Sequence, residues 1–170
     1  MAKIGRKGRL WLRSFHVFFM GLWVGAIISQ VVVLLFTGLV QSDGGLRAMY
    51  KIPDILNIVT APAGLGTIVT GLLLAWLTPW GFFKHKWVIY SMSMVVIDLL
   101  IVFVLSDPAI SKLSALVEAE GLGALQNPEY VSTWKRFIII AAVCPLFLIS
   151  AAFVSVLKPW RKHKEAEAVA

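Results

Sequence analysis

The sequence predicts an all-α protein, a four-helix transmembrane bundle that forms a single domain over residues 1–170. Of its 170 residues, 59% are hydrophobic and only 15% are charged. That is more apolar surface than a soluble domain of this size can bury, so we expect the lipid bilayer to be its partner. Four segments with almost no charge, 14–42, 55–83, 87–106 and 137–157, each reach the length of about 20 residues that a membrane-spanning helix needs.

The distribution of positive charge predicts the topology. Eleven of the sixteen Lys and Arg residues lie near the two chain ends and in the middle connection. This pattern is typical of four helices that run up-down-up-down with N and C termini both cytoplasmic. We therefore expect a multi-pass protein of the bacterial cytoplasmic (inner) membrane. The basic excess indicates anionic lipid headgroups, and we expect no nucleic-acid partner.

The first two helices are predicted over residues 10–40 and 55–77. Gly44 and Gly45 supply turn chemistry after the first helix. The second contains "TAPAGLGTIVTG", whose small residues allow close approach of a neighbouring backbone or a flat ligand. Pro62 should kink this helix and free a carbonyl group near Ile58.

The last two membrane helices are predicted over residues 86–105 and 134–157. In the connection between them, Asp107 suits a helix N-cap, Pro108 the first turn and Gly121 the end. The apolar residues of this stretch share one face, so we expect a short amphipathic helix lying on the outer membrane surface. The lone cysteine, Cys144, excludes an internal disulfide and a paired-cysteine metal site.

His16 is a titratable ring inside the first apolar segment. Helical spacing places Met20, Trp23 and Gln30 on its stripe, which indicates that the stripe faces the bundle interior. One interpretation is a neutral histidine bonded to a backbone carbonyl or to Tyr90. The other is a ligand to a metal or cofactor.

Lys86 and Asp98 are the other two ionisable residues of functional interest. Lys86 opens the third helix with Tyr90 on its face, and it is either a membrane anchor or a functional lysine. Asp98 lies about 18 Å further along that helix, in the outer half of the membrane. It should be protonated, hydrogen-bonded or ion-paired, and we leave open a structural role and a catalytic role in a proton path. Its candidate partners are Gln30, Asn57, Thr60, Lys135 and Arg136.

The stretch "FHVFFMGLWVG", with His16, Trp23 and Gly25, resembles the first helix of a group of small bacterial membrane proteins. The group comprises copper-resistance D-type membrane domains, HemJ-type protoporphyrinogen oxidases and an uncharacterised family of four-helix integral membrane proteins. "GFFKHKWVIY" is similar to their third-helix start, with its lysine at Lys86. The apolar continuation "AIISQVVVLLF" differs from the HemJ-type pattern, so the four-helix family is the favoured relative.

The resemblance implies a b-type haem (haem b) with His16 as the axial metal ligand, and a functional Lys86. Small residues would wall the haem slot and cations would meet the propionates. The full set of expected cofactor-binding residues is His16, Arg13, Met20, Trp23, Lys86 and Tyr90, with Lys84 also at the rim. For a second axial ligand we consider Met20, Met92, His85 or none.

Three hypotheses follow for function. The first is a haem protein with a redox or electron-transfer role, a haem-dependent oxidoreductase served by a membrane redox partner or quinone. The second is a metal-ion or proton transporter or channel subunit that uses Asp98 and His16. The third is a non-catalytic accessory membrane subunit. "GLWVG" offers a small-residue face for a homodimer.

Overall fold

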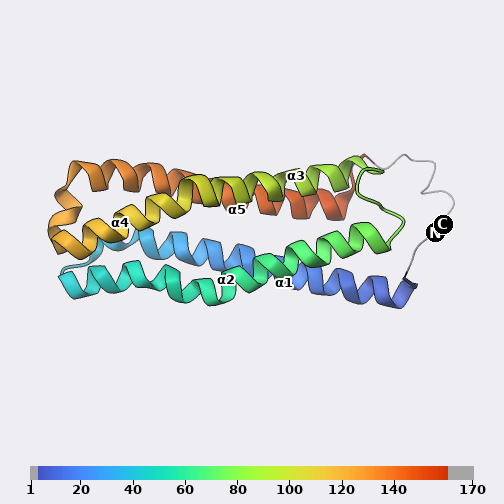
Figure 1. Cartoon of the computed structure of the whole chain (residues 1–170), viewed down its shortest axis with the longest axis horizontal. Helices are drawn as coiled ribbons and strands as arrows, with labels where there is room; N and C mark the ends of the chain where they lie inside the picture. The colour runs from blue at the N-terminus through green and yellow to red at the C-terminus, as the bar shows by residue number, and fades with distance from the viewer. Residues whose placement is uncertain (1–3, 161–170) are drawn as a thin grey trace.

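The computed structural model of the protein describes residues 4–160, and all of its regular elements are helices (Figure 1). The expected all-helical class is therefore confirmed. In chain order the elements are α1 (Arg6–Leu35), η1 (Thr37–Leu39), α2 (Asp43–Leu77), α3 (Lys86–Ile101), η2 (Val102–Ser106), α4 (Asp107–Glu120), η3 (Gly121–Gln126) and α5 (Pro128–Leu157).

Within the described chain, four helical segments are long and apolar enough to cross a membrane. They are Arg6–Leu39, Asp43–Leu77, Lys86–Gln126 and Pro128–Leu157. Only 11 to 33% of the residues in their most apolar stretches are buried inside the protein. Most of their apolar side chains therefore face outward, which suits a multi-pass membrane protein with lipid as its solvent. The membrane that holds it, and the side on which its ends lie, stay predictions.

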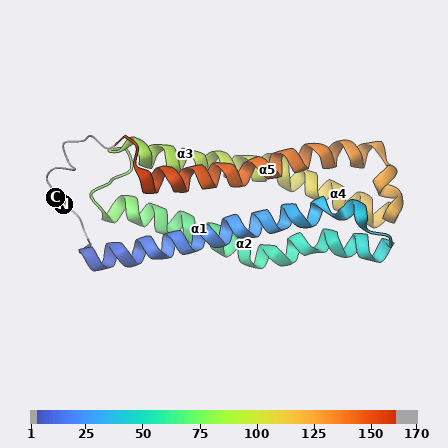
Figure 2. The same ribbon diagram turned by 180° about the vertical axis from the view of Figure 1, so that it is seen from behind.

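The long helices associate as two pairs. α1 packs along α2, α3 packs along α5, and α1 also contacts α5 (Figures 1 and 2). α1 begins, α5 ends and α2 connects to α3 at one end of the bundle. We call it the basic end, after its described cations Arg6, Lys7, Arg9, Arg13, Lys84, Lys86 and Lys158. The opposite end, formed around α4 and η3, is the α4 end.

The bounds of three helices differ from the prediction. α2 begins at Asp43, twelve residues before residue 55, and the Ser42 side chain accepts a hydrogen bond from the Gly45 amide at 3.2 Å. α5 begins at Pro128 rather than 134, behind an Asn127 cap, and α1 spans 6–35 rather than 10–40. The charge-free runs mark only the part of each helix that suits lipid. A helix of 35 residues is about 52 Å long, well beyond a hydrocarbon core of about 30 Å.

The expected connecting helix is present as α4, with Pro108 in its first turn and Gly121 at its end. Its placement differs from expectation, because α4 continues α3 through the π-helical η2 (Figure 1). Pro108 lacks the amide hydrogen for a regular bond to the Val104 carbonyl, and the wider π turn precedes this proline. The apolar face of α4 packs inside the bundle, where Leu113 and Val117 are 0% exposed. That burial explains why the face does not rest on lipid.

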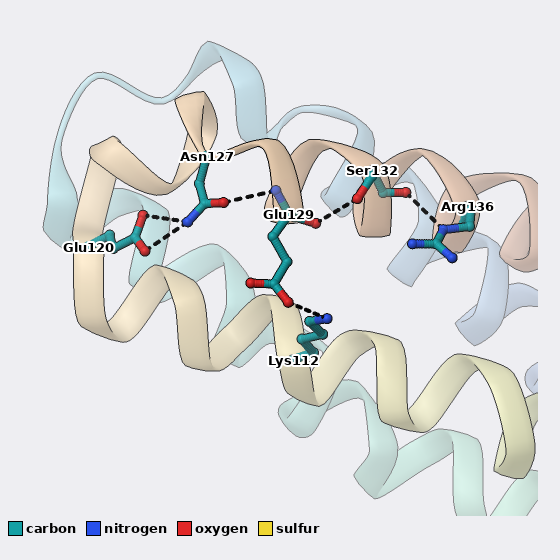
Figure 3. Close-up of polar contacts among 6 residues, drawn as sticks. All are labelled: Lys112, Glu120, Asn127, Glu129, Ser132 and Arg136. Atoms are coloured by element: carbon teal, nitrogen blue, oxygen red, sulfur yellow. Dashed lines mark hydrogen bonds and ion pairs between the residues drawn. The ribbon is translucent and has the colours of Figure 1, made fainter.

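Polar contacts fasten α4 to α5 at the α4 end (Figure 3). Glu120 accepts two bonds from the Asn127 amide, at 2.9 and 3.1 Å, and Asn127 accepts the Glu129 backbone N–H at 2.8 Å. Glu129 also pairs with Lys112 at 2.6 Å. The Tyr50 and Tyr130 hydroxyls are buried and 2.7 Å apart, in the same core cluster as Leu113 and Val117 of α4. This end of the bundle is therefore closed by both polar and apolar packing.

Candidate functional site

A partly open cavity of about 480 Å³ lies between the two helix pairs, in the half of the bundle nearest the basic end, and some of its lining residues, such as Val17 and Val156, are exposed. All four long helices contribute to its wall, which is predominantly apolar. Residues that matter for its chemistry are Arg13, His16, Met20, Gly21, Gly71, Trp80, Trp87, Ser91, Met92, Ser155 and Lys158. A largely apolar cavity of this size with a few polar groups is typical of a small-molecule or cofactor site.

His16 contributes an imidazole ring to the cavity wall. Its Nδ1 lies 3.0 Å from the Thr67 carbonyl oxygen and 2.9 Å from the Thr70 hydroxyl oxygen. A carbonyl oxygen only accepts, so these contacts assign the ring proton to Nδ1. The Thr70 hydroxyl donates to the Gly66 carbonyl at 2.6 Å and is free to accept from Nδ1. Nε2 then has a lone pair and no hydrogen bond within the described chain, as a metal-binding imidazole requires.

Close packing of α1 on α2 holds the imidazole in this position. A Cβ atom at Gly71 would lie 3.1 Å from His16 Cε1, and one at Gly66 would lie 2.6 Å from the Phe19 ring. The glycines therefore let α1 side chains approach the α2 backbone closely. The small residues of "TAPAGLGTIVTG" thus serve the close approach of a neighbouring helix, and Gly64 likewise contacts the Trp23 ring.

Two cations and two indoles lie where the cavity meets the basic end. Lys158 Nζ is 4.6 Å from the Trp80 ring centroid and 5.0 Å from that of Trp87. The two indoles meet edge to face at 5.3 Å. Arg13 lines the cavity from α1. Positive charge beside an apolar cavity favours a ligand that has both an apolar body and an anionic group.

The structure brings only part of the predicted cofactor set together. His16, Arg13 and Met20 line the cavity, whereas Lys86, Tyr90 and Trp23 do not. Lys86 is exposed, and so is Ser93 on the same stripe. Tyr90 donates to the Ser150 hydroxyl at 3.1 Å, and Trp23 is buried against Ala63 and Leu148. The expected stripe on α3 therefore turns partly outward, and Lys158 takes the rim position expected for Lys84 and Lys86.

Asp98 lies apart from this cavity and from its predicted partners. It is 0% exposed, and neither carboxylate oxygen has a hydrogen bond within the described chain. Gln30 donates to Thr60 at 3.1 Å instead, and Arg136 donates to the Ser132 carbonyl at 3.3 Å. The side chain beside the Asp98 carboxyl group is the Cys144 thiol. The structure thus separates Asp98 from His16.

Sequence reasoning missed Thr67, Thr70 and Lys158. The two threonines stand one helical turn apart in "TIVT", a spacing that places both hydroxyls on one face of α2. That face could have been matched to His16 only by knowing that α1 packs on α2. Met92 was named as a candidate ligand, and it lines the cavity from α3. His85, another candidate, stacks on Trp87 outside the cavity wall.

No three His, Cys, Asp or Glu side chains within residues 4–160 are grouped so that they could hold a metal ion. Gly25, part of the expected dimer face, is exposed and has nothing within 4 Å of a Cβ position, and the homodimer stays a prediction. Searches of protein-family models, curated proteins and solved structures found no match to this chain.

Proposed function

We propose that this chain is a membrane-embedded b-type haem protein with a redox or electron-transfer role and with His16 as an axial ligand. The observation that supports this most is the hydrogen bonding of His16. Nδ1 is held by Thr67 and Thr70, which leaves Nε2 as a lone-pair donor on a ring that lines the cavity. An imidazole anchored through its other nitrogen is the usual form of a metal-ligating histidine.

The cavity also suits the rest of a haem group. Its volume of about 480 Å³ falls in the range of roughly 300–1,000 Å³ typical of cofactor sites. Apolar side chains from all four long helices would cover the macrocycle, and Gly21 and Gly71 keep the wall thin near His16. Arg13 and Lys158 would pair with the carboxylates of the propionates. A porphyrin supplies four nitrogen donors, so one protein imidazole suffices.

When bound, haem supplies one-electron redox chemistry or the binding of a small gaseous molecule. Met92 lines the same cavity from α3, so it would be the second protein donor available to a bound haem. Met20 lies one turn from His16 on the same helix, so it is poorly placed to approach the opposite face of a porphyrin. Ligation by Met92 would favour electron transfer with a membrane partner or quinone, and an open face would favour oxidoreductase chemistry.

The test is the absorption spectrum of the protein after expression with a haem precursor and purification in detergent. We expect a Soret band in the wild type, its loss in His16→Ala, and its retention in His85→Ala. His85 is a matched control, because it is a histidine at the same end of the bundle but outside the cavity wall. A wild type that stays colourless after haem reconstitution would overturn the proposal. A band that disappears equally in both variants would remove His16 as the ligand.

A further inference from the structure

Asp98 has an unusual environment for a carboxyl group. It lies in the last full turn of α3 and faces α5, the helix that packs along α3. The side chain is 0% exposed, and neither oxygen has a hydrogen bond within residues 4–160. No ion pair joins it to a cation in the described chain, and Lys135 and Arg136 are exposed residues of α5. These two cations lie about 12 Å along α5 from the residue that faces Asp98.

That facing residue is Cys144, which is 2% exposed. Its thiol is the titratable group of α5 that lies beside the Asp98 carboxyl group. The backbone on both sides departs from regular α-helix. Pro145 leaves the Ala141 carbonyl without its helical donor, and the π-helical η2 begins four residues after Asp98. Irregular turns of this kind recur at functional positions in membrane helices.

An ionised carboxylate without a partner is strongly disfavoured in a dry interior, so Asp98 is expected to retain its proton. A neutral carboxylic acid offers one O–H donor and a carbonyl acceptor, and a thiol offers a weak donor and a weak acceptor. The two groups can therefore satisfy each other. The nearest hydroxyl along this face of α3 belongs to Ser91, about 10 Å away. Ser91 already bonds to Ser155 at 2.8 Å.

We propose that Asp98 and Cys144 form a membrane-buried proton-binding site between α3 and α5, in which Asp98 holds the proton as a neutral carboxylic acid and the adjacent Cys144 thiol is the group able to hydrogen-bond to it. This site is independent of the haem proposal, because neither residue lines the cavity. Release of the proton to water leaves an anion in a dry interface. Release therefore requires α3 to separate from α5 or water to enter, which couples protonation of Asp98 to the packing of this helix pair.

Infrared difference spectroscopy of the purified full chain, without added haem, tests the site. The chain has one cysteine, so its S–H stretching band reports Cys144 alone. We expect a protonated-carboxyl C=O band at neutral pH that is lost in Asp98→Asn. The S–H band should shift in the same variant, since its hydrogen-bond partner changes. In Cys144→Ala the C=O band should persist at a shifted frequency.

The controls separate the site from a general effect on folding. Asp54→Asn alters an exposed carboxylate of α2, and it should leave both bands unchanged. If Asp98→Asn fails to fold, the shift of the C=O band in Cys144→Ala still tests the pair. A wild type without a protonated-carboxyl band at neutral pH would overturn the proposal. So would a C=O band that is identical in the wild type and Cys144→Ala, because the thiol would then not be its partner.

Discussion

Substitution of Gly71 by alanine tests whether the anchored imidazole governs ligand binding. The new methyl group would lie 3.1 Å from His16 Cε1, whereas carbon atoms pack best at about 3.5–4.0 Å. The ring must therefore withdraw by a few tenths of an ångström. A retreat of this size away from α2 stretches the Nδ1 contacts, now 3.0 and 2.9 Å, to or past the usual limit of about 3.2 Å.

The expected loss follows from the unpaired Nδ1–H. In the haem-free variant the displaced ring can turn to pair its Nδ1–H, whereas a bound haem would hold the ring with this donor unpaired, at a cost of about 1–3 kcal/mol. Every 1.4 kcal/mol is about tenfold in affinity. We therefore expect Gly71→Ala to weaken haem binding by roughly 5- to 150-fold. The assay is titration of the haem-free protein with haemin, followed at the Soret band. Gly25→Ala is the control, because nothing lies within 4 Å of its Cβ position. Equal affinities for Gly71→Ala, Gly25→Ala and wild type would refute the reasoning.

Three further predictions concern stability, measured by denaturant unfolding in detergent. Gly121→Ala should lower the free energy of unfolding by about 2–3 kcal/mol, because Gly121 has φ 56° and a Cβ atom there would meet the Asp43 side chain. Gly123→Ala is the control and should have little effect. Similar unfolding midpoints for the two variants would contradict this prediction. Tyr50→Phe should cost about 1–3 kcal/mol, since it leaves the buried Tyr130 hydroxyl without its 2.7 Å partner. Lys112→Ala breaks an exposed ion pair and should cost less than about 1 kcal/mol at any salt concentration.

The membrane-spanning character of the helices could be predicted because it depends on composition over long runs. The same signal misplaced the start of α2, because the segment from Asp43 to Asp54 is charged and yet helical. Composition predicts the part of a helix that lies in lipid, but it does not predict how far that helix continues into water. The α3–α4 junction failed for a related reason. Asp107, Pro108 and the amphipathic pattern indicate a new helix, and only tertiary packing decides whether that helix continues the previous axis.

The candidate site was only partly predictable for a geometric reason. The stripe through His16 and Met20 faces the interior, since helical period alone decides which α1 residues share a face. For α3 the helical period left open which stripe faces the interior. Lys86 and Ser93 are exposed, and the inward face runs through Ser91 and Asp98. Polar residues occur on both stripes, so the sequence could not distinguish the lipid-facing from the buried set.

The two ends of the bundle differ in how closely their helices pack. At the α4 end, Leu113, Val117 and the tyrosine pair fill the space between helices, and ion pairs close the surface. Toward the basic end the helix pairs separate enough to leave the cavity that His16 lines. Close packing at the α4 end fixes the relative positions of the long helices. The helices can therefore stay in place at the basic end even though a cavity separates them there. Substitutions at the α4 end should therefore change stability more than ligand affinity, and those around His16 should do the reverse.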